Sequence, residues 1–163
     1  MFLNTLGFGF DGLANRYVHE MPNTTFSTWN YMWSALKANI YRQPFFVKID
    51  YEDKHKLMML TLANGRVEGG KFWIAPNASV TDGQLDLVQI RPVNRWLLPF
   101  LLPFFIFKKI SWIPYLDTTK LSNLDLKIEN RVEVHADGEI IKTDTNNFSI
   151  CMHDNKLPII CNL

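Results

Sequence analysis

Short β-prone segments separated by turn residues occupy most of this 163-residue chain. Runs rich in Val, Ile, Leu, Phe and Thr end repeatedly at Asn, Asp or Gly, which is typical of short strands joined by turns. Such a pattern favours packed antiparallel sheets in a sandwich-like arrangement of layers. The predicted strands are Phe2–Phe10, Phe45–Tyr51, Lys56–Ala63, a short apolar strand after Gly69-Gly70, a strand that follows Asp82-Gly83 and continues to Arg91, Leu121–Ile128, Arg131–Ala136, Glu139–Thr143, Phe148–Met152 and Pro158–Cys161.

Two or three helices are expected beside these strands. One follows Asp11 and runs through His19, and a second is capped by Thr24 or Thr25 and ends at Pro44. The second helix has an approximately helical period of large apolar residues, and we expect this stripe to lie in the core. Its members are Phe26, Trp29, Tyr31, Met32, Trp33, Leu36 and Ile40.

The most apolar segment is W-L-L-P-F-L-L-P-F-F-I-F, from Trp96 to Phe107. A membrane-spanning helix needs about 20 apolar residues, and this run is shorter and contains Pro99 and Pro103. We therefore predict a short, bent helix, either in the core or at an interface. Together these patterns predict one domain over residues 1–163, mainly β (α+β), an antiparallel β-sandwich with two or three helices.

Composition narrows the classes of function. Hydrophobic residues make up 47% of the chain, which excludes disorder. The 17 basic and 16 acidic residues nearly balance, so no nucleic-acid partner is expected. Cys151 and Cys161 have no metal-type spacing and are expected to be reduced thiols, with a disulfide between neighbouring strands as the alternative. The chain enters a strand directly after Met1 without a basic leader, so we expect a piece of a longer protein rather than a secretory signal.

Several common catalytic motifs are absent from the sequence. It contains no G-x-x-x-x-G-K-[ST] loop, no H-E-x-x-H motif and no G-x-S-x-G motif. The four histidines, His19, His55, His135 and His153, are scattered, and we expect them to be surface or structural residues.

The first candidate site is the turn S-V-T-D-G-Q, from Ser79 to Gln84. It brings backbone carbonyls and the Asp82 carboxylate together over a few residues, and hard cations such as Mg²⁺ prefer oxygen ligands of this kind. A solvated Asp-Gly turn without a metal is the competing interpretation.

The second candidate site is V-H-A-D-G-E-I-I, from Val134 to Ile141. Asp137-Gly138 predicts a type I′ hairpin, in which both central residues have positive φ. Glu139 follows the turn, and a carboxylate held in this way can act as a general base. An ordinary hairpin with a charged edge is the alternative.

The order of these pieces is more specific than any one of them. G-F-G-F-D-G, then G-G-K-F-W-I-A-P-N-A-x-x-T-D-G-x-L-D-L, then V-H-A-D-G-E resembles the C-terminal domain of the diacylglycerol kinase family. This family includes bacterial soluble diacylglycerol kinases, related bacterial lipid kinases and sphingosine kinases. The resemblance runs from about Phe2 to Ile160.

The resemblance implies a two-domain lipid kinase of which this chain is the C-terminal half. Family members carry a G-G-D-G-T motif in an N-terminal nucleotide-binding domain, and that motif is absent here. ATP and a lipid such as diacylglycerol would meet in the cleft between the domains, and a structural Mg²⁺ would help to order that cleft. The isolated chain is expected to be inactive, and the whole protein to be cytoplasmic.

The resemblance also implies roles for individual residues. Glu139 corresponds to the proposed general base of the family. Asp82, with the backbone carbonyls of Ser79 and Gln84, corresponds to its Mg²⁺ site. Asp11 and Asp137 would belong to the same acidic network on the cofactor-binding side.

One departure affects the substrate contacts that the resemblance implies. Family members often have Gly-x-His after the Leu-Pro segment, where this chain has F-K-K-I-S-W from Phe107 to Trp112. The apolar segment beside Lys108-Lys109 could contact a membrane surface, and a core helix with a solvated basic end is the alternative. A non-catalytic β-sandwich that binds lipid or protein, or a kinase for a non-lipid alcohol, also remains open.

Overall fold

The computed structural model describes residues 1–21, 28–50 and 53–153. Its helices are α1 (Phe10–His19), α2 (Thr28–Tyr41), α3 (Leu98–Ile106) and the 3₁₀ helix η1 (Ile110–Trp112). Its strands are β1 (Thr5–Gly9), β2 (Phe45–Ile49), β3 (His55–Leu57), β4 (Met59–Ala63), β5 (Leu85–Ile90), β6 (Leu116–Leu121), β7 (Asn123–Ile128), β8 (Val134–Ala136), β9 (Glu139–Ile141) and β10 (Asn147–Cys151).

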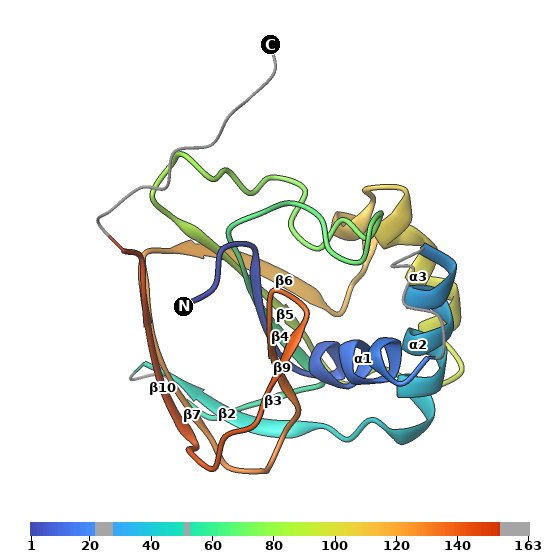
Figure 1. Ribbon diagram of the computed structural model, residues 1–163, viewed down its shortest axis with the longest axis horizontal. Coiled ribbons are helices and arrows are strands. Elements are labelled where there is room, and N and C mark those ends of the chain that lie inside the picture. Colours follow the sequence, from blue (N-terminus) through green and yellow to red (C-terminus); the bar gives the residue numbers. More distant parts are fainter. Residues whose placement is uncertain (22–27, 51–52, 154–163) are drawn as a thin grey trace.

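The strands form two antiparallel sheets packed as a sandwich (Figure 1). The larger sheet has the order β6-β5-β4-β1-β8-β9, and the smaller has the order β10-β7-β2-β3. The helices lie against the outer face of the larger sheet, where α1 contacts β1, β4, β8 and β9. The predicted fold class, an antiparallel β-sandwich with a few helices, is confirmed.

The burial pattern of each strand follows from these three layers. In β2 and β7 buried and exposed residues alternate, because only one face of the smaller sheet is covered. In β4 all five residues are buried, since helices cover one face and the second sheet covers the other. The core between the sheets includes Leu6, Phe8, Leu60 and Val134. Residues next to these along β1, β4 and β8 therefore point towards the helices.

The prediction that the aromatic stripe of α2 lies in the core is wrong for part of the stripe. Tyr31 is buried, but Trp29, Trp33 and Ile40 are exposed. The buried face of the helix is made mainly by small residues such as Ala35 and Ala38. Small side chains allow α2 to approach its neighbours closely, and the larger apolar side chains are left on the opposite side.

Other differences concern strand boundaries. His55, predicted to lie in a turn, begins β3 and pairs with Val47. The strand β6 was not predicted as a separate element, because four of its six residues are exposed and polar at the edge of the sheet. The predicted cap at Thr24 or Thr25 and the strand at Pro158–Cys161 lie outside the described residues. Within the described ranges, no helix has the length and hydropathy needed to cross a bilayer.

Candidate functional site

The β8–β9 hairpin turns at Asp137 and Gly138, as predicted. Their φ angles are 51° and 90°, so both central residues have the positive φ of a type I′ turn. Ala136 pairs with Glu139 across the turn. The backbone of Gly138 is also held from α1, because the His19 ring donates a hydrogen bond of 2.8 Å from Nε2 to the Gly138 carbonyl oxygen.

The Asp137 carboxylate fastens this turn to the start of β1. It accepts hydrogen bonds from the backbone amides of Leu3 (2.7 Å), Asn4 (2.7 Å) and Thr5 (2.9 Å). The Asp137 amide in turn donates to the Thr5 carbonyl at 2.8 Å. Hydrogen bonds to an ionised acceptor are about twice as strong as neutral ones. The turn that precedes Glu139 is therefore held by its own aspartate.

Glu139 is exposed at the edge of the larger sheet. Paired residues of an antiparallel sheet share a face, so Glu139 is on the face of Ala136 and not on that of His135. The predicted base is thus solvent-accessible and attached to a well-held turn.

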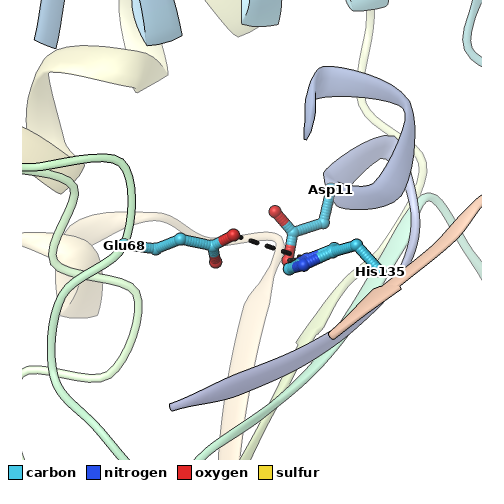
Figure 2. Close-up of side chains that lie close together, drawn as sticks. All are labelled: Asp11, Glu68 and His135. Carbon is cyan, nitrogen blue, oxygen red and sulfur yellow. Dashed lines mark ion pairs between the residues drawn. The ribbon is translucent and has the colours of Figure 1, made fainter. Parts of the chain in front are cut away.

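A buried polar cluster lies on the other face of the same hairpin, between the sheet and α1 (Figure 2). It consists of Asp11 from the first turn of α1, Glu68 from the loop after β4, and His135 from β8. His135 Nε2 lies 3.1 Å from Asp11 Oδ2 and 3.4 Å from Glu68 Oε1. All three side chains are buried, so each charge is screened little by water.

Gly7 makes room for this cluster. In the sheet register it pairs with both His135 and Thr61. A Cβ at Gly7 would lie 2.2 Å from His135 Nε2 and 2.3 Å from Asp11 Oδ2. The ion pair therefore needs glycine at this position of β1.

Neighbouring hydroxyl and amide groups hydrogen-bond the two carboxylates. Asp11 accepts from Thr61 Oγ1 at 2.6 Å and from the Tyr31 hydroxyl at 3.1 Å. Glu68 Oε1 accepts from Asn15 Nδ2 at 2.8 Å. Among the described atoms, Glu68 Oε2 has no hydrogen-bond partner. Asp11 is thus the better-satisfied carboxylate of the two.

This difference separates the pKa values of the two acids. Burial raises the pKa of Asp11, but the charge of His135 and the hydrogen bonds from Thr61 and Tyr31 outweigh it, and the net shift is downward. Burial, together with the nearby Asp11 charge, raises the pKa of Glu68 to about 8. Near neutral pH, Asp11 is therefore ionised and Glu68 carries a proton.

The His135 ring connects the cluster to the turn. Burial lowers the pKa of His135, but Asp11 and then Glu68 raise it more strongly, to about 9. With Glu68 protonated, an imidazolium and the Asp11 carboxylate leave the cluster without net charge, which makes its burial less costly. The Gly138 amide lies 3.3 Å from Nδ1, where it can donate to the neutral ring but not to the imidazolium.

The same contact bears on metal binding. The cluster offers three ligand atoms within 4.8 Å of one another, which is a plausible metal-ligand set. However, Nε2 carries a proton both in the imidazolium and in the neutral ring that accepts the Gly138 amide at Nδ1, and a metal would need the lone pair of that nitrogen. The geometry therefore favours an ion pair over a metal centre.

The predicted cation site at Ser79–Gln84 is an exposed turn. Asp82 Oδ1 accepts the Gln84 amide at 3.0 Å, and Oδ2 accepts the Lys120 ammonium at 2.6 Å. The hydrogen bond from Lys120 holds the pKa of Asp82 below its usual value. The oxygen atoms of this turn are ligands of the kind that Mg²⁺ prefers. In this structure the positive charge beside the Asp82 carboxylate is the Lys120 ammonium.

The two predicted sites share one end of the larger sheet. β5 begins just after Gln84 and β9 begins at Glu139, and the register places both starts at the Thr5 end of β1. Four strand spacings of ~4.8 Å separate β5 from β9, a distance of about 19 Å. The sites therefore face the same side of the molecule without touching.

A groove of about 760 Å³ opens beside the hairpin, between α1 and β9. Its wall combines the apolar side chains of Leu13, Tyr17 and Ile140 with the basic groups of Arg16 and Lys142. Glu139 is not among the lining residues, in keeping with its position on the other face.

Sequence reasoning found Asp11, Asp137 and Glu139 but missed Glu68, and it expected His135 to be a surface or structural residue. His135 does occupy the position in V-H-A that points towards the helices, and this alternation was a usable signal. Glu68 offered none, because it reaches the cluster from a loop whose path the sequence does not reveal.

Comparison with known proteins agrees with this architecture. Residues 4–153 match the family described as the YegS C-terminal NAD kinase beta sandwich-like domain. A Bacillus subtilis (strain 168) protein named "Putative lipid kinase YtlR" is 25% identical over 152 residues, which are 87% of this chain and 49% of that protein.

Two solved structures, each described as a "putative diacylglycerol kinase" from Bacillus anthracis str. Sterne, share the fold. One has a TM-score of 0.56 at 21% identity and covers 92% of this chain and 47% of its own. The other has a TM-score of 0.57 at 21% identity and covers 94% of this chain and 51% of its own. The chain thus spans about half the length of these relatives. It belongs to the YegS C-terminal domain family, and its resemblance to the C-terminal domain of diacylglycerol kinase-like lipid kinases is confirmed.

Proposed function

We propose that this chain is the lipid-binding, base-supplying domain of an ATP-dependent lipid kinase. The reaction would transfer the γ-phosphoryl group of ATP to a lipid hydroxyl such as that of diacylglycerol. The observation that carries this proposal is the type I′ turn, which Asp137 fastens to β1 and which presents the exposed Glu139 beside it.

Glu139 acts as the general base in this proposal. Its carboxylate accepts the proton of the lipid hydroxyl while that oxygen forms a bond to the γ-phosphorus. The bond between the γ-phosphorus and the bridging oxygen breaks, and ADP leaves with the electron pair. Phosphoryl transfer depends chiefly on positioning and charge stabilisation, and a carboxylate next to a held turn loses little freedom when substrate arrives.

The reaction also needs a nucleotide and a metal ion. A companion nucleotide-binding domain would hold most of the ATP, and its cleft would close over the end of the sheet shared by Glu139 and Asp82. Asp82, with the carbonyls of Ser79 and Gln84, would hold Mg²⁺, which supplies positive charge and order near the cleft. Asp11 and Asp137 would act by holding α1 and the hairpin in place. The whole protein would work from the cytoplasm on lipid in a membrane.

The test uses a longer protein in which the companion domain is present. Glu139→Gln should lower turnover by at least about 100-fold, because general-base catalysis contributes roughly 10²–10⁴. Circular dichroism and thermal unfolding should match the wild type. Near-normal turnover in this variant would remove Glu139 from the base role.

The isolated chain provides the matching negative control. It should show no ATP turnover with diacylglycerol, with other lipid alcohols or with short non-lipid alcohols. A longer protein that binds lipid but turns over none of these acceptors would favour a non-catalytic binding module. That second function draws support from the exposed aromatic residues of α2.

A further inference from the structure

The helix α2 is apolar on two opposite faces. Tyr31, Ala35 and Ala38 face the core. At 100° per residue, Trp29, Trp33 and Ile40 fall on the far side of the helix, and the two tryptophans are 77% and 66% exposed. A helix of a globular protein normally has charged or polar residues on that outer face.

Helix α3 and the residues on either side of it are also apolar both in the core and on the exposed side. All nine residues of the helix, L-P-F-L-L-P-F-F-I, are apolar. Leu98, Leu101, Leu102 and Phe105 fill the core, but Phe100 is 73% exposed. Trp96 before the helix is 85% exposed, and Phe107 and Trp112 after it are also exposed.

These two regions are neighbours on one side of the molecule. α2 packs against α3, and the two lie together at the side of the sheet in Figure 1. Asn39 on α2 donates a 2.8 Å hydrogen bond to the carbonyl of Arg95, the residue before Trp96. We use "aromatic surface" for the exposed residues Trp29, Trp33, Trp96, Phe100, Phe107 and Trp112. Exposed apolar residues on neighbouring elements mark interaction sites more often than single scattered ones do.

The segments that carry the aromatic surface contain basic residues and no acidic ones, although Asp117 pairs with Arg91 and Glu20 pairs with Lys37 from outside them. Residues 87–116 contain Arg91, Arg95, Lys108 and Lys109 and no Asp or Glu, and residues 28–49 are also without acidic residues. The chain as a whole has 17 basic and 16 acidic residues, so this absence is local. Lys109 Nζ lies 5.3 Å from the ring centroid of Trp112, which places a cation directly beside an exposed aromatic residue.

We propose that the aromatic surface docks on an anionic lipid bilayer. Tryptophan and phenylalanine insert at the level of the headgroups, while neighbouring lysines and arginines contact lipid phosphates. The absence of acidic residues removes repulsion from such a surface, and a protein partner would not require that absence. The proposal rests on the proposed function for its biological sense, since a lipid kinase must reach lipid in a membrane. Its evidence is the surface itself.

The experiment measures sedimentation of the chain with vesicles that contain neither diacylglycerol nor ATP. Vesicles of pure phosphatidylcholine are compared with vesicles in which about a third of the lipid is phosphatidylglycerol. The wild type should bind the anionic vesicles and bind the neutral ones more weakly. Trp96→Ser with Phe100→Ser should weaken both by about tenfold or more, because burial of each aromatic side chain is lost. Lys109→Glu should weaken only the anionic case.

The matched control is Val80→Ser, which changes an exposed apolar residue in the loop before β5 and should bind like the wild type. No binding by the wild type, or unchanged binding by the double variant, would overturn the proposal. A concentration-dependent dimer that the double variant abolishes would also overturn it, because a second copy of the chain would then cover the aromatic surface. Loss of vesicle binding when the companion domain is present would do the same, because that domain would then cover the aromatic surface. A kinase assay in detergent separates this outcome from that of the proposed function, since turnover there needs no bilayer.

Discussion

Replacing Glu68 by glutamine is the most direct test of the buried cluster. The amide keeps the shape and the acceptor that receives Asn15 Nδ2, but it cannot ionise. The pKa of Glu68 is raised from its ordinary value of 4.5 to about 8 by burial and then by Asp11. In the folded chain the carboxyl thus keeps a proton that the unfolded chain releases. Stability is lost as pH rises from about 4.5 to about 8.

The magnitude follows from the interval between the assay pH and this pKa. Each pH unit of differential protonation is about 1.36 kcal/mol. From pH 6 to about pH 8, two pH units, the free energy of unfolding of the wild type falls, and above pH 8 Glu68 is ionised in the folded chain as well. Between pH 6 and pH 9 the wild type should therefore lose about 2–3 kcal/mol of stability that Glu68→Gln does not lose. His135, whose pKa of about 9 adds a further loss as pH rises above its ordinary value of 6.5, is present in both proteins and largely cancels.

The assay is urea unfolding followed by tryptophan fluorescence at pH 6 and pH 9. Glu68→Gln should be more stable than the wild type at both values, and the gap should widen by about 2–3 kcal/mol at pH 9. Glu139→Gln, which removes an exposed carboxylate, is the control and should show no widening. An equal gap at both pH values would mean that Glu68 is ionised in the folded chain throughout, and the charge assignment of the cluster would be wrong.

Two further substitutions test the packing around the hairpin. Gly7→Ala should lower the free energy of unfolding by about 2–4 kcal/mol, because its Cβ would collide with His135 and Asp11. Gly83→Ala, which meets no atom within 4 Å but has a φ of 71°, should cost only about 1 kcal/mol, and equal losses in thermal unfolding would contradict the steric argument. Asp137→Asn keeps a residue that tolerates positive φ but weakens three hydrogen bonds, so a loss of about 1–3 kcal/mol is expected in urea unfolding, and no loss would show that the carboxylate does not hold the turn.

Local signals in the sequence predicted the hairpin well. Asp-Gly between two β-prone runs allows few turn types, and the observed φ angles agree with the predicted one. The sandwich was also predictable, because short strands with turn residues leave few other arrangements. These features depend on residues close together in the chain.

Long-range features were harder to predict. Glu68 meets Asp11 and His135 across 57 and 67 positions of sequence, and only the packing of a loop, α1 and β8 against one another brings them together. For α2, helical periodicity could not say which apolar face would be buried. The face with Tyr31, Ala35 and Ala38 packs inward because it allows close approach, and Trp29 and Trp33 are left outside. The roles of Glu139, Asp82, Ser79 and Gln84 stay predictions.

The position of β9 at the end of the larger sheet has a consequence for hydrogen exchange. β1, between β4 and β8, should exchange its amide hydrogens only when the whole domain unfolds. The three residues of β9 have one neighbouring strand among the described elements, so their amides should exchange through brief local openings. Gly7 therefore belongs to the slowest-exchanging part of the molecule, while the amides of β9 should exchange sooner even though Asp137 holds the turn before Glu139 to β1. Exchange in β9 can thus be followed separately from the unfolding of the strands that carry the buried charges.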